Sequence, residues 1–463
     1  MVPERLRPVL DVANDLALRF RAQKARLYLV GGVVRDALLD RLNAQSDLDF
    51  TTDASPEVTE AVLAGWAEKT WAQGKRFGTI AASKAGRRIE VTTHRAEQYD
   101  AASRKPDVAF STVIEADLAR RDFTVNAMAI SLPDLALVDP FGGVTDLAAK
   151  KLRTPLSPEI SFTDDPLRML RAARFIAGYD LEPEPELLTA VARWRGRLDI
   201  VSDERVREEL DKLIVVPDPA PGLWFLVRTG LAEEFLPELP ALALEQDPVH
   251  RHKDVLAHTI AVVQRARPER IVRLAALFHD VGKPKTRSFG PAGAVSFHHH
   301  ELVGARMTRD RMRALRYPSE DIERVSNLVE LHLRFHTYGM GWTDSAIRRY
   351  VRDAGDLLDQ LNELTRADCT TRNASKARAL AARMDELERR IEELREEEEL
   401  AAIRPDLDGR DVMAHLGLAP GPLVGRALAF LLEERLDHGP RPREEALALL
   451  DSWWAAQPEA GQP

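Results

Sequence analysis

The pattern of apolar and polar positions changes character near residue 150. Before that point, short apolar or alternating runs separated by turn residues and helix-like segments predict a compact α/β unit. These runs are RLYLVGG (26–32), SDLDFTT (46–52), GTIAAS (78–83), RRIEVTTHR (87–95) and VNAMAISL (125–132). After DPFGG (139–143) the strand signal almost disappears and a period of about 3.6 residues dominates. The predicted fold class is therefore α+β, a mixed α/β first part followed by an all-α remainder.

The helical part has further boundaries. Prolines at 217, 219, 221, 237, 240 and 248 predict one boundary within 216–250. A second is expected near 375, because apolar residues then recur at 380, 384, 387, 391 and 394 within a long, strongly charged helix that packs through a narrow seam. Short helices joined by Gly and Pro turns are expected after it. The predicted segments are 1–150, 151–235, 236–375 and 376–463.

Composition narrows the class of protein. The 463 residues, 44% apolar and 30% charged, are enough for roughly three or four domains. The single cysteine, Cys369, excludes an intramolecular disulfide framework, and the N-terminus lacks the apolar core of a signal peptide. No apolar run approaches the ~18 residues that span a bilayer, so we expect a cytoplasmic protein without membrane partners. The net charge of −9 does not indicate nucleic-acid binding, but it does not exclude it, because binding depends on local Arg and Lys clusters.

The stretch GGVVRDALLDRLNAQSDLDF (31–50) carries the first candidate chemistry. Alternation along a strand places Asp47 and Asp49 on one face, where their mutual repulsion favours a bound cation, and hard oxygen ligands suit Mg²⁺. Gly31 and Gly32 allow backbone N–H groups to approach a triphosphate at the start of a helix, and Arg35, one turn later, can reach the same phosphates.

Glu90 is the candidate third carboxylate. It lies between Ile89 and Val91 on a predicted neighbouring strand, so its side chain leaves the core face. It is either part of the same site or an ordinary solvent-facing strand residue.

Five ordered motifs resemble the class II tRNA nucleotidyltransferase and bacterial poly(A) polymerase family, and they span about the first 215 residues. The motifs are LVGGVVRDALLDR…SDLDFTT, RRDFTVNAMAI (120–130), VDPFGGVTDLAAKKLRT (138–154), TDDPLRMLRAARF (163–175) and SDERVREEL (202–210). The resemblance implies a polymerase-beta-like nucleotidyltransferase head and a helical neck. It also implies that Asp47 and Asp49 bind metal and that Gly32 and Arg35 bind nucleotide. By the same resemblance, the sugar and phosphate side of the pocket is lined by Arg121, Asp122 and Asn126.

The motif 163–175 is the candidate base-reading element. Asp165, Arg168, Arg171 and Arg174 recur every three residues, which predicts one slowly drifting helix face that either reads a base or forms exposed ion pairs. A carboxylate accepts and a guanidinium donates hydrogen bonds, so Asp165 with Arg168 would suit cytosine and adenine and reject uracil and guanine without a template. The family assigns base reading to these two positions, whereas Arg171 and Arg174 would serve the triphosphate or brace the pair.

Two details of these motifs leave alternatives open. The family usually has Glu where this chain has Asp164, a shorter side chain that puts the switch from C to A in doubt. Gly142 and Gly143 could form a hinge for the head or a simple interdomain turn.

A second constellation lies in the helical part. His258, His279, Asp280, His300, His332 and Asp368 form a spaced His/Asp series, and imidazole and carboxylate ligands suit a divalent metal with open positions. The order resembles the HD phosphohydrolase superfamily, which implies that His258, His279, Asp280 and Asp368 bind a divalent metal of unknown identity and activate water. Resemblance to HD-bearing tRNA nucleotidyltransferases implies a phosphatase or 2′,3′-cyclic phosphodiesterase activity on RNA ends. The other histidines are interpreted as caps or surface residues, with the role of His299 uncertain; they are His250, His252, His298 and His299.

The leading hypothesis is a CCA-adding tRNA nucleotidyltransferase acting on the tRNA 3′ end with CTP, ATP and Mg²⁺. The nearest rival is a poly(A) polymerase or an A-adding enzyme, although NAMAISL before VDPFGG is more similar to the CCA-adding pattern. An HD phosphohydrolase with a nucleotide-sensing head and a noncatalytic RNA-binding module are weaker alternatives. For RNA contact, the densest basic cluster is in 305–317, either a phosphate-binding surface or an ordinary exposed helix face; its arginines are Arg306, Arg309, Arg311, Arg313 and Arg316.

Overall fold

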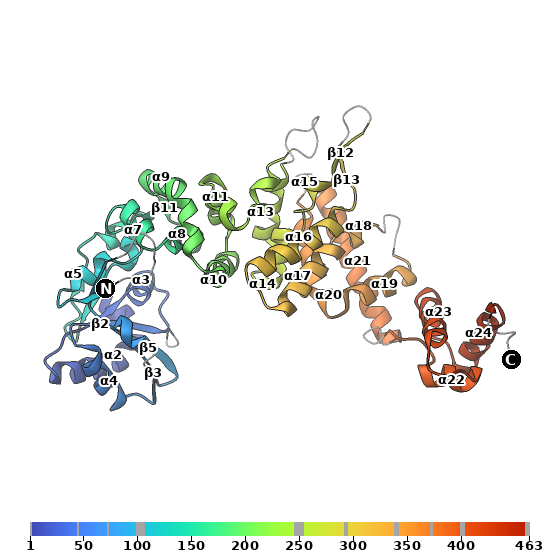
Figure 1. Ribbon diagram of the computed structural model, residues 1–463, viewed down its shortest axis with the longest axis horizontal. Helices are drawn as coiled ribbons and strands as arrows, with labels where there is room; N and C mark the ends of the chain where they lie inside the picture. Colours follow the sequence, from blue (N-terminus) through green and yellow to red (C-terminus); the bar gives the residue numbers. More distant parts are fainter. Residues whose placement is uncertain are drawn as a thin grey trace. The chain divides into compact units, whose positions relative to one another are not determined.

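A computed structural model describes residues 2–43, 46–71, 74–98, 107–244, 254–290, 295–337, 342–370, 374–398 and 403–458 (Figure 1). The chain divides into two compact units. The first comprises Met1–Pro240 with Ala314–Arg316, and the second Ala241–Arg313 with Tyr317–Pro463. The finer division into head, neck, HD domain and tail stays a prediction. Among the described residues, no helix is both long and apolar enough to span a membrane.

The first unit contains a seven-stranded mixed sheet in the order β3-β4-β5-β2-β1-β8-β9. Among the described pairs of this seven-stranded sheet, β2–β5 alone is parallel. The strands are β1 (Leu27–Val30), β2 (Leu48–Thr52), β3 (Lys69–Trp71), β4 (Thr79–Lys84), β5 (Arg87–Thr93), β8 (Ala129–Leu132) and β9 (Leu137–Val138). All five predicted strands are confirmed, but the last begins later than expected, because Thr124–Asn126 form a 3₁₀ turn closed by local backbone hydrogen bonds.

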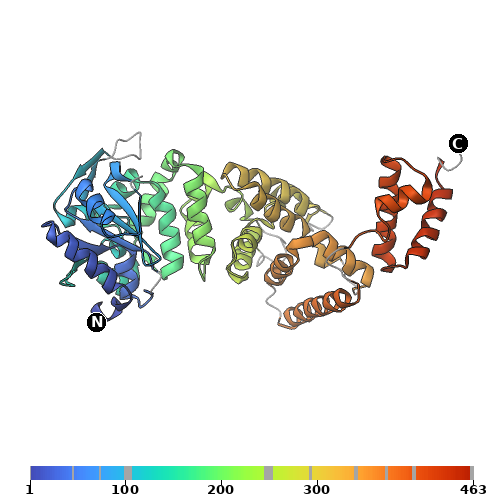
Figure 2. The same cartoon turned by 90° about the horizontal axis from the view of Figure 1, so that it is seen from below.

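Helices cover one face of this sheet (Figure 2). Leu16 and Phe20 of α2 pack with Phe50 and Ile89 of the sheet, and Ser55 caps α4 by accepting a hydrogen bond from the Val58 N–H. The helices of this unit are α1 (Val2–Arg5), α2 (Arg7–Ala22), α3 (Gly32–Leu38), α4 (Pro56–Ala64), α5 (Ile114–Ala119), α6 (Gly143–Ala148), α7 (Pro158–Asp164), α8 (Leu167–Tyr179), α9 (Pro185–Trp194), α10 (Asp203–Ile214), α11 (Ala220–Arg228) and α12 (Ala232–Phe235). Two-stranded ladders join β6 (Arg95–Gln98) to β7 (Asp107–Phe110) and β10 (Lys151–Leu152) to β11 (Glu182–Pro183).

The opposite face of the sheet is only partly covered. Ile114 and Leu118 of α5 pack against Tyr28, Val30 and Ala129, which belong to β1 and β8. Helix α5 therefore covers the apolar part of this face. The polar residues of β2 and β5 on the same face are left uncovered by it.

The second unit is almost entirely helical, as predicted. Its helices are α13 (Val255–Arg265), α14 (Arg270–Phe278), α15 (Lys283–Thr286), α16 (His300–Ala314), α17 (Ser319–Leu331), α18 (Arg334–Thr337), α19 (Asp344–Ala354), α20 (Leu358–Asp368), α21 (Ala374–Glu398), α22 (Gly409–Leu416), α23 (Pro422–His438) and α24 (Arg443–Ala455). The one hairpin in its described part joins β12 (Arg287–Phe289) to β13 (Val295–Phe297).

The long charged helix is confirmed as α21. Met384, Leu387, Ile391 and Leu394 are buried along one seam, and Arg389 on the exposed side pairs with neighbouring glutamates. The glutamate-rich sequence therefore forms a solvated face, as expected.

Candidate active site and histidine–aspartate centre

Two of the three predicted catalytic carboxylates lie side by side in the sheet. Asp49 of β2 is in direct register with Glu90 of β5. Asp47 is exposed and precedes β2 by one residue, so it lies at the strand end rather than inside the strand. Although Asp49 is itself exposed, loss of hydration from the surrounding protein raises its pKa, and the negative charges of Glu90 and Asp47 add to this effect. An all-oxygen cluster with mutual repulsion fits a hard divalent cation such as Mg²⁺.

The glycine pair forms the turn into α3. Gly31 has φ +69° and ψ −130°, a conformation that essentially only glycine adopts. A Cβ at this position would lie 3.0 Å from Nη1 of Arg121, whose positive charge partly offsets the rise in the pKa of Asp49. The structure therefore brings the glycine turn, Arg121 and the carboxylates into one neighbourhood.

Asp117 holds Arg121 and was missed from the sequence. This fully buried aspartate of α5 accepts hydrogen bonds from Arg120 at 2.6 Å and from Arg121 at 3.1 Å. Burial opposes ionisation, but the two guanidinium groups lower the pKa of Asp117 to about 2. An acid three and four residues ahead of adjacent arginines in a helical segment was the available signal.

Arg35 is part of the internal framework. Only 6% of the residue is exposed, its Nη1 donates to Oδ1 of Asn126 at 2.6 Å, and its guanidinium lies 4.1 Å from the ring centre of Tyr179. Asn126 in turn donates to Oδ1 of Asp122 at 2.9 Å. These contacts give Arg35 a bracing position, and its role in phosphate binding stays a prediction.

Asp122 is the centre of a charged network. Its Oδ2 accepts hydrogen bonds from Nε and Nη2 of Arg171 at 2.9 and 2.7 Å. Burial opposes ionisation, but Arg171 and Asn126 hold the pKa of Asp122 well below its usual range. Arg171 also reaches Glu209 of α10 at 3.4 Å, and Arg174 reaches the same glutamate at 2.7 Å. Both arginines are thus held by acidic residues, and their expected roles, serving the triphosphate or bracing the base-reading pair, stay predictions.

The base-reading residues are arranged differently from the sequence expectation. Pro166 disfavours helical backbone in the residue before it, so Asp165 is extended and α8 begins only at Leu167. The Asp165 carboxylate accepts from the Leu167 N–H at 3.3 Å and lies 3.8 Å from Arg205. The spacing had predicted that Asp165 lies on the same helix face as Arg168. This prediction is wrong, because Asp165 precedes the helix.

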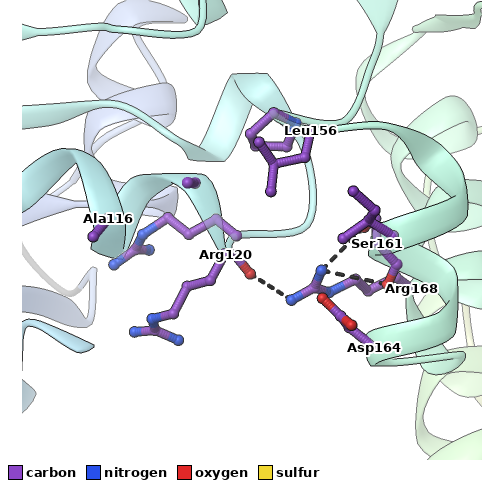
Figure 3. Close-up of a pocket in the computed structure, with 10 residues that line it drawn as sticks. Ala116, Arg120, Leu156, Ser161, Asp164 and Arg168 are labelled. Atoms are coloured by element: carbon purple, nitrogen blue, oxygen red, sulfur yellow. Dashed lines mark hydrogen bonds between the residues drawn. The ribbon is translucent and has the colours of Figure 1, made fainter. Parts of the chain in front are cut away.

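Arg168 faces a cavity of about 290 Å³ (Figure 3). Its guanidinium donates to the Ser161 hydroxyl at 3.0 Å and to the backbone carbonyl of Arg120. Asp164, where the family usually has Glu, lines the same cavity, whereas Asp165 does not. The lining comprises Ala116, Ala119, Arg120, Arg121, Pro155, Leu156, Ile160, Ser161, Asp164 and Arg168. The side-chain carboxylate that the structure places with Arg168 in this cavity is thus Asp164.

The DPFGG segment is a tightly packed turn. Both carboxylate oxygens of Asp139 accept backbone N–H groups, from Gly143 at 2.7 Å and from Val144 at 3.0 Å, which caps α6. A Cβ on Gly143 would lie 2.2 Å from the Thr124 carbonyl oxygen. The hinge role stays a prediction.

The predicted HD ligands converge in the second unit. His258 Nε2 lies 3.2 Å from His279 Nε2, 3.0 Å from an Asp368 oxygen and 3.6 Å from an Asp280 oxygen. His300 and His332, which had not been assigned as ligands, also face this centre: each belongs with Asp280 to one group of converging ligand atoms. We call these six residues the histidine–aspartate centre.

Backbone oxygens orient three of the four imidazoles. The Nδ1 atoms of His279, His300 and His332 lie 2.6–2.8 Å from carbonyl oxygens three residues earlier in the chain, which leaves each Nε2 facing the centre. His258 Nδ1 instead lies 2.7 Å from the Thr370 hydroxyl. Such contacts fix the tautomer of histidines that bind metal.

The electrostatics of the centre also fit a cation. Burial lowers the pKa of His332 to about 3, so this imidazole is neutral and able to bind metal. Burial opposes ionisation of Asp280, but His279 and Lys283 lower its pKa. The buried Nε2 of His300 lies 3.4 Å from an Asp280 oxygen without forming a well-oriented hydrogen bond within the described residues. A divalent transition metal is the cation that matches this donor set.

The remaining histidine and arginine expectations have mixed outcomes. His298 and His299 are exposed, which confirms their interpretation as surface residues, whereas His250 and His252 lie outside the described residues. In the basic cluster of α16, Arg309 lies 3.7 Å from Glu330 and Arg313 lies 3.5 Å from Asp310. This interleaving with acids weakens the case for an RNA-binding surface there.

Comparison with known proteins agrees with this architecture. The Poly A polymerase head domain matches residues 27–153, the "probable RNA and SrmB-binding site of polymerase A" matches 180–242, and the HD domain matches 255–391. The fold is similar to the crystal structure of the Bacillus stearothermophilus CCA-adding enzyme in complex with CTP, with a TM-score of 0.70, 23% identity and 97% coverage of each chain. The fold and these matches thus define a protein with a Poly A polymerase head domain followed by an HD domain.

Curated relatives identify the family. An A-adding tRNA nucleotidyltransferase of Deinococcus radiodurans is 35% identical, covering 92% of this chain and 95% of the relative. A CC-adding tRNA nucleotidyltransferase of Thermus thermophilus is 34% identical, covering 92% and 93%. A CCA-adding enzyme of Bacillus licheniformis is 40% identical over 45% of this chain and 51% of the relative. The chain belongs to the tRNA nucleotidyltransferase family.

Proposed function

We propose that this protein adds C, C and A to the tRNA 3′ end from CTP and ATP without a nucleic-acid template. The observation that carries this proposal is the direct register of Asp49 with Glu90, close to Asp47, the glycine turn and Arg121. In the reaction, the RNA 3′ hydroxyl loses its proton to solvent and its oxygen forms a bond to the α-phosphorus. The bond between the α-phosphorus and the oxygen that bridges it to the β-phosphorus breaks, and pyrophosphate leaves with that oxygen.

Each group of residues has a distinct task. Asp47 and Asp49, with Glu90, would hold Mg²⁺, which activates the hydroxyl and neutralises the phosphates when bound. The turn at Gly31 and Gly32 brings backbone close to the triphosphate, and Arg121, anchored by Asp117, supplies positive charge there.

Base choice is assigned to the cavity beside Arg168. A donor from Arg168 and an acceptor from a neighbouring carboxylate match the amino group and ring nitrogen that cytosine and adenine share. Sequence resemblance names Asp165 as the acceptor, whereas Asp164 lines the cavity. The variants Asp164→Asn and Asp165→Asn distinguish these two candidate acceptors. Replacement of the carboxylate that reads the base allows incorporation of UTP or GTP, whereas replacement of the other carboxylate leaves the preference for C and A unchanged.

Addition of A alone is the second candidate. It is favoured by one observation: of two relatives that are matched over more than nine-tenths of their own length, one is named A-adding and the other CC-adding. The protein would then accept only tRNA that already ends in CC.

A single assay distinguishes these functions. Pure protein, Mg²⁺ and a tRNA transcript lacking its last three nucleotides are incubated with each nucleotide singly and with CTP plus ATP, and products are resolved at single-nucleotide resolution. Two additions with CTP and a stop after one A when both are present would establish CCA addition. A-addition restricted to a transcript ending in CC would establish the second candidate, long A tails would indicate a poly(A) polymerase, and no incorporation on any RNA would refute both.

We also propose that the histidine–aspartate centre is a metal-dependent phosphohydrolase site. The support is the convergence of four imidazoles and two carboxylates, with the Nδ1 atoms of three of the imidazoles oriented by backbone carbonyl oxygens. Hydrolysis of 2′,3′-cyclic phosphate RNA ends and of phosphomonoesters should depend on added Mn²⁺, Ni²⁺ or Co²⁺ and disappear in Asp280→Ala. An equal rate in wild type and Asp280→Ala would refute this assignment.

A further inference from the structure

One transverse row of residues crosses four strands of the head sheet. Trp71 of β3 is in register with Ala81 of β4, Ala81 with Glu90 of β5, and Glu90 with Asp49 of β2. Residues in register point to the same face of a sheet, and adjacent strands are about 4.8 Å apart. The row therefore runs from the candidate catalytic carboxylates to Trp71 over about 14 Å.

The part of this face next to Trp71 is hollow. A cavity of about 530 Å³ extends over it, and Trp71, Ala81, Arg88 and Glu90 are among its lining residues. Trp71 is 45% exposed, which is unusual for so large an apolar side chain. The side chain of Ala81, between the indole and Glu90, is small and therefore leaves open space above the sheet there. An indole is thus displayed beside the carboxylate row.

Positive charges lie in the neighbouring row of the same face. Lys69 of β3 is in register with Ser83 of β4, and Ser83 with Arg88 of β5. Lys69 is exposed, and the side chain of Arg88 is 65% exposed while pairing with Glu90 at 2.7 Å. Two cations next to an exposed aromatic ring suit single-stranded RNA, because the cations can contact phosphates while a base stacks on the ring. The same surface leads directly to the acidic residues that suit a metal ion.

We propose that this surface of β3, β4 and β5, which we call the Trp71 platform, binds the single-stranded 3′ end of the RNA just behind the attacking hydroxyl. A base in the last few nucleotides stacks on Trp71, and Lys69 and Arg88 contact the phosphates. The inference rests on the proposed function, because the row leads to Asp49 and Glu90. It assigns the RNA end, rather than the incoming nucleotide, to this side of the carboxylates.

The test compares Trp71→Ala with Trp71→Phe, which keeps an aromatic face, and with Phe289→Ala as a matched control. Phe289 is another exposed aromatic, at 67%, on a strand of the second unit. Loss of one stacked base weakens binding by about 5- to 150-fold. We expect Trp71→Ala to raise the KM for tRNA by about 10-fold, because other tRNA contacts remain, while the KM for CTP and ATP and the melting temperature stay unchanged. Trp71→Phe should recover most of the affinity, and Phe289→Ala should resemble wild type.

An unchanged KM for tRNA in Trp71→Ala would overturn the proposal, as would an equal rise in the KM for nucleotide. If wild type incorporates no nucleotide, the proposed function fails, and the platform is then tested by binding alone. Fluorescence anisotropy with a tRNA carrying a single-stranded 3′ end and with a blunt-ended version should show a preference for the overhang in wild type that Trp71→Ala loses. Retention of that preference in Trp71→Ala would overturn the platform independently.

Discussion

Replacing Arg171 by methionine should destabilise the first unit by about 3 kcal/mol at neutral pH. Asp122, of which 8% is exposed, receives two hydrogen bonds from Arg171 and would be left as a buried charge without its cation. Breaking a buried pair in this way costs about 3–5 kcal/mol, and the lower end applies because Asp122 keeps its bonds from the Phe123 N–H and Asn126. For a unit of this size, about 3 kcal/mol lowers Tm by roughly 6–12 °C.

The pH dependence gives this prediction a second readout. Because the folded-state pKa of Asp122 is lowered, its ionised form contributes stability above the unfolded pKa of about 3.9, and this contribution is lost as the pH falls. In Arg171→Met, burial without the guanidinium raises the pKa of Asp122 instead. The stability difference between wild type and variant should therefore be widest near pH 7 and should narrow towards pH 4.

Thermal and urea unfolding at pH 7 and pH 4, followed by circular dichroism, measures these differences. Arg389→Met removes exposed pairs with Glu386 and Glu393 and should leave Tm almost unchanged. The double variant Asp122→Asn with Arg171→Met should recover part of the stability, because neither partner then carries an unpaired charge. A Tm within 2 °C of wild type for Arg171→Met, or a difference that does not depend on pH, would refute the reasoning.

Three further outcomes are expected. Asp49→Asn should reduce nucleotide incorporation by at least roughly 100-fold without changing the affinity for tRNA. Asp53→Asn, on the same chain segment, is the control and should retain activity. An active Asp49→Asn would contradict the metal assignment. Gly31→Ala should lose nucleotide incorporation and stability, because its Cβ would meet a guanidinium at 3.0 Å. Gly417→Ala, where φ is +67° but the surroundings are open, should lose only stability. Equal activity of the two variants would argue against a role of the glycine turn in nucleotide binding. Mass spectrometry should detect a transition metal in wild type that dialysis against a chelator removes. Asp280→Ala should contain little metal even before dialysis. Equal metal content in the two proteins would contradict metal binding at the histidine–aspartate centre.

Much of the architecture was determined by sequence pattern. Alternating runs predicted five strands, two of which carry Asp49 and Glu90, because a strand's two faces impose a period of two residues. The regular spacing from 380 to 394 predicted α21 and its buried seam. Glycine at 31 was predictive because its backbone conformation is forbidden to other residues. These features depend on neighbours in sequence, which a single chain reveals.

Other features were decided by tertiary structure. Asp164 rather than Asp165 shares a cavity with Arg168, because Pro166 delays the start of α8 and turns Asp165 away. His300 and His332 join the histidine–aspartate centre, and Trp71 lines up with Asp49 across four strands. The contacts of His300 and His332 and the alignment of Trp71 with Asp49 join segments far apart in the chain. Their positions are fixed by strand register and helix packing, which the spacing of residues along one segment does not encode.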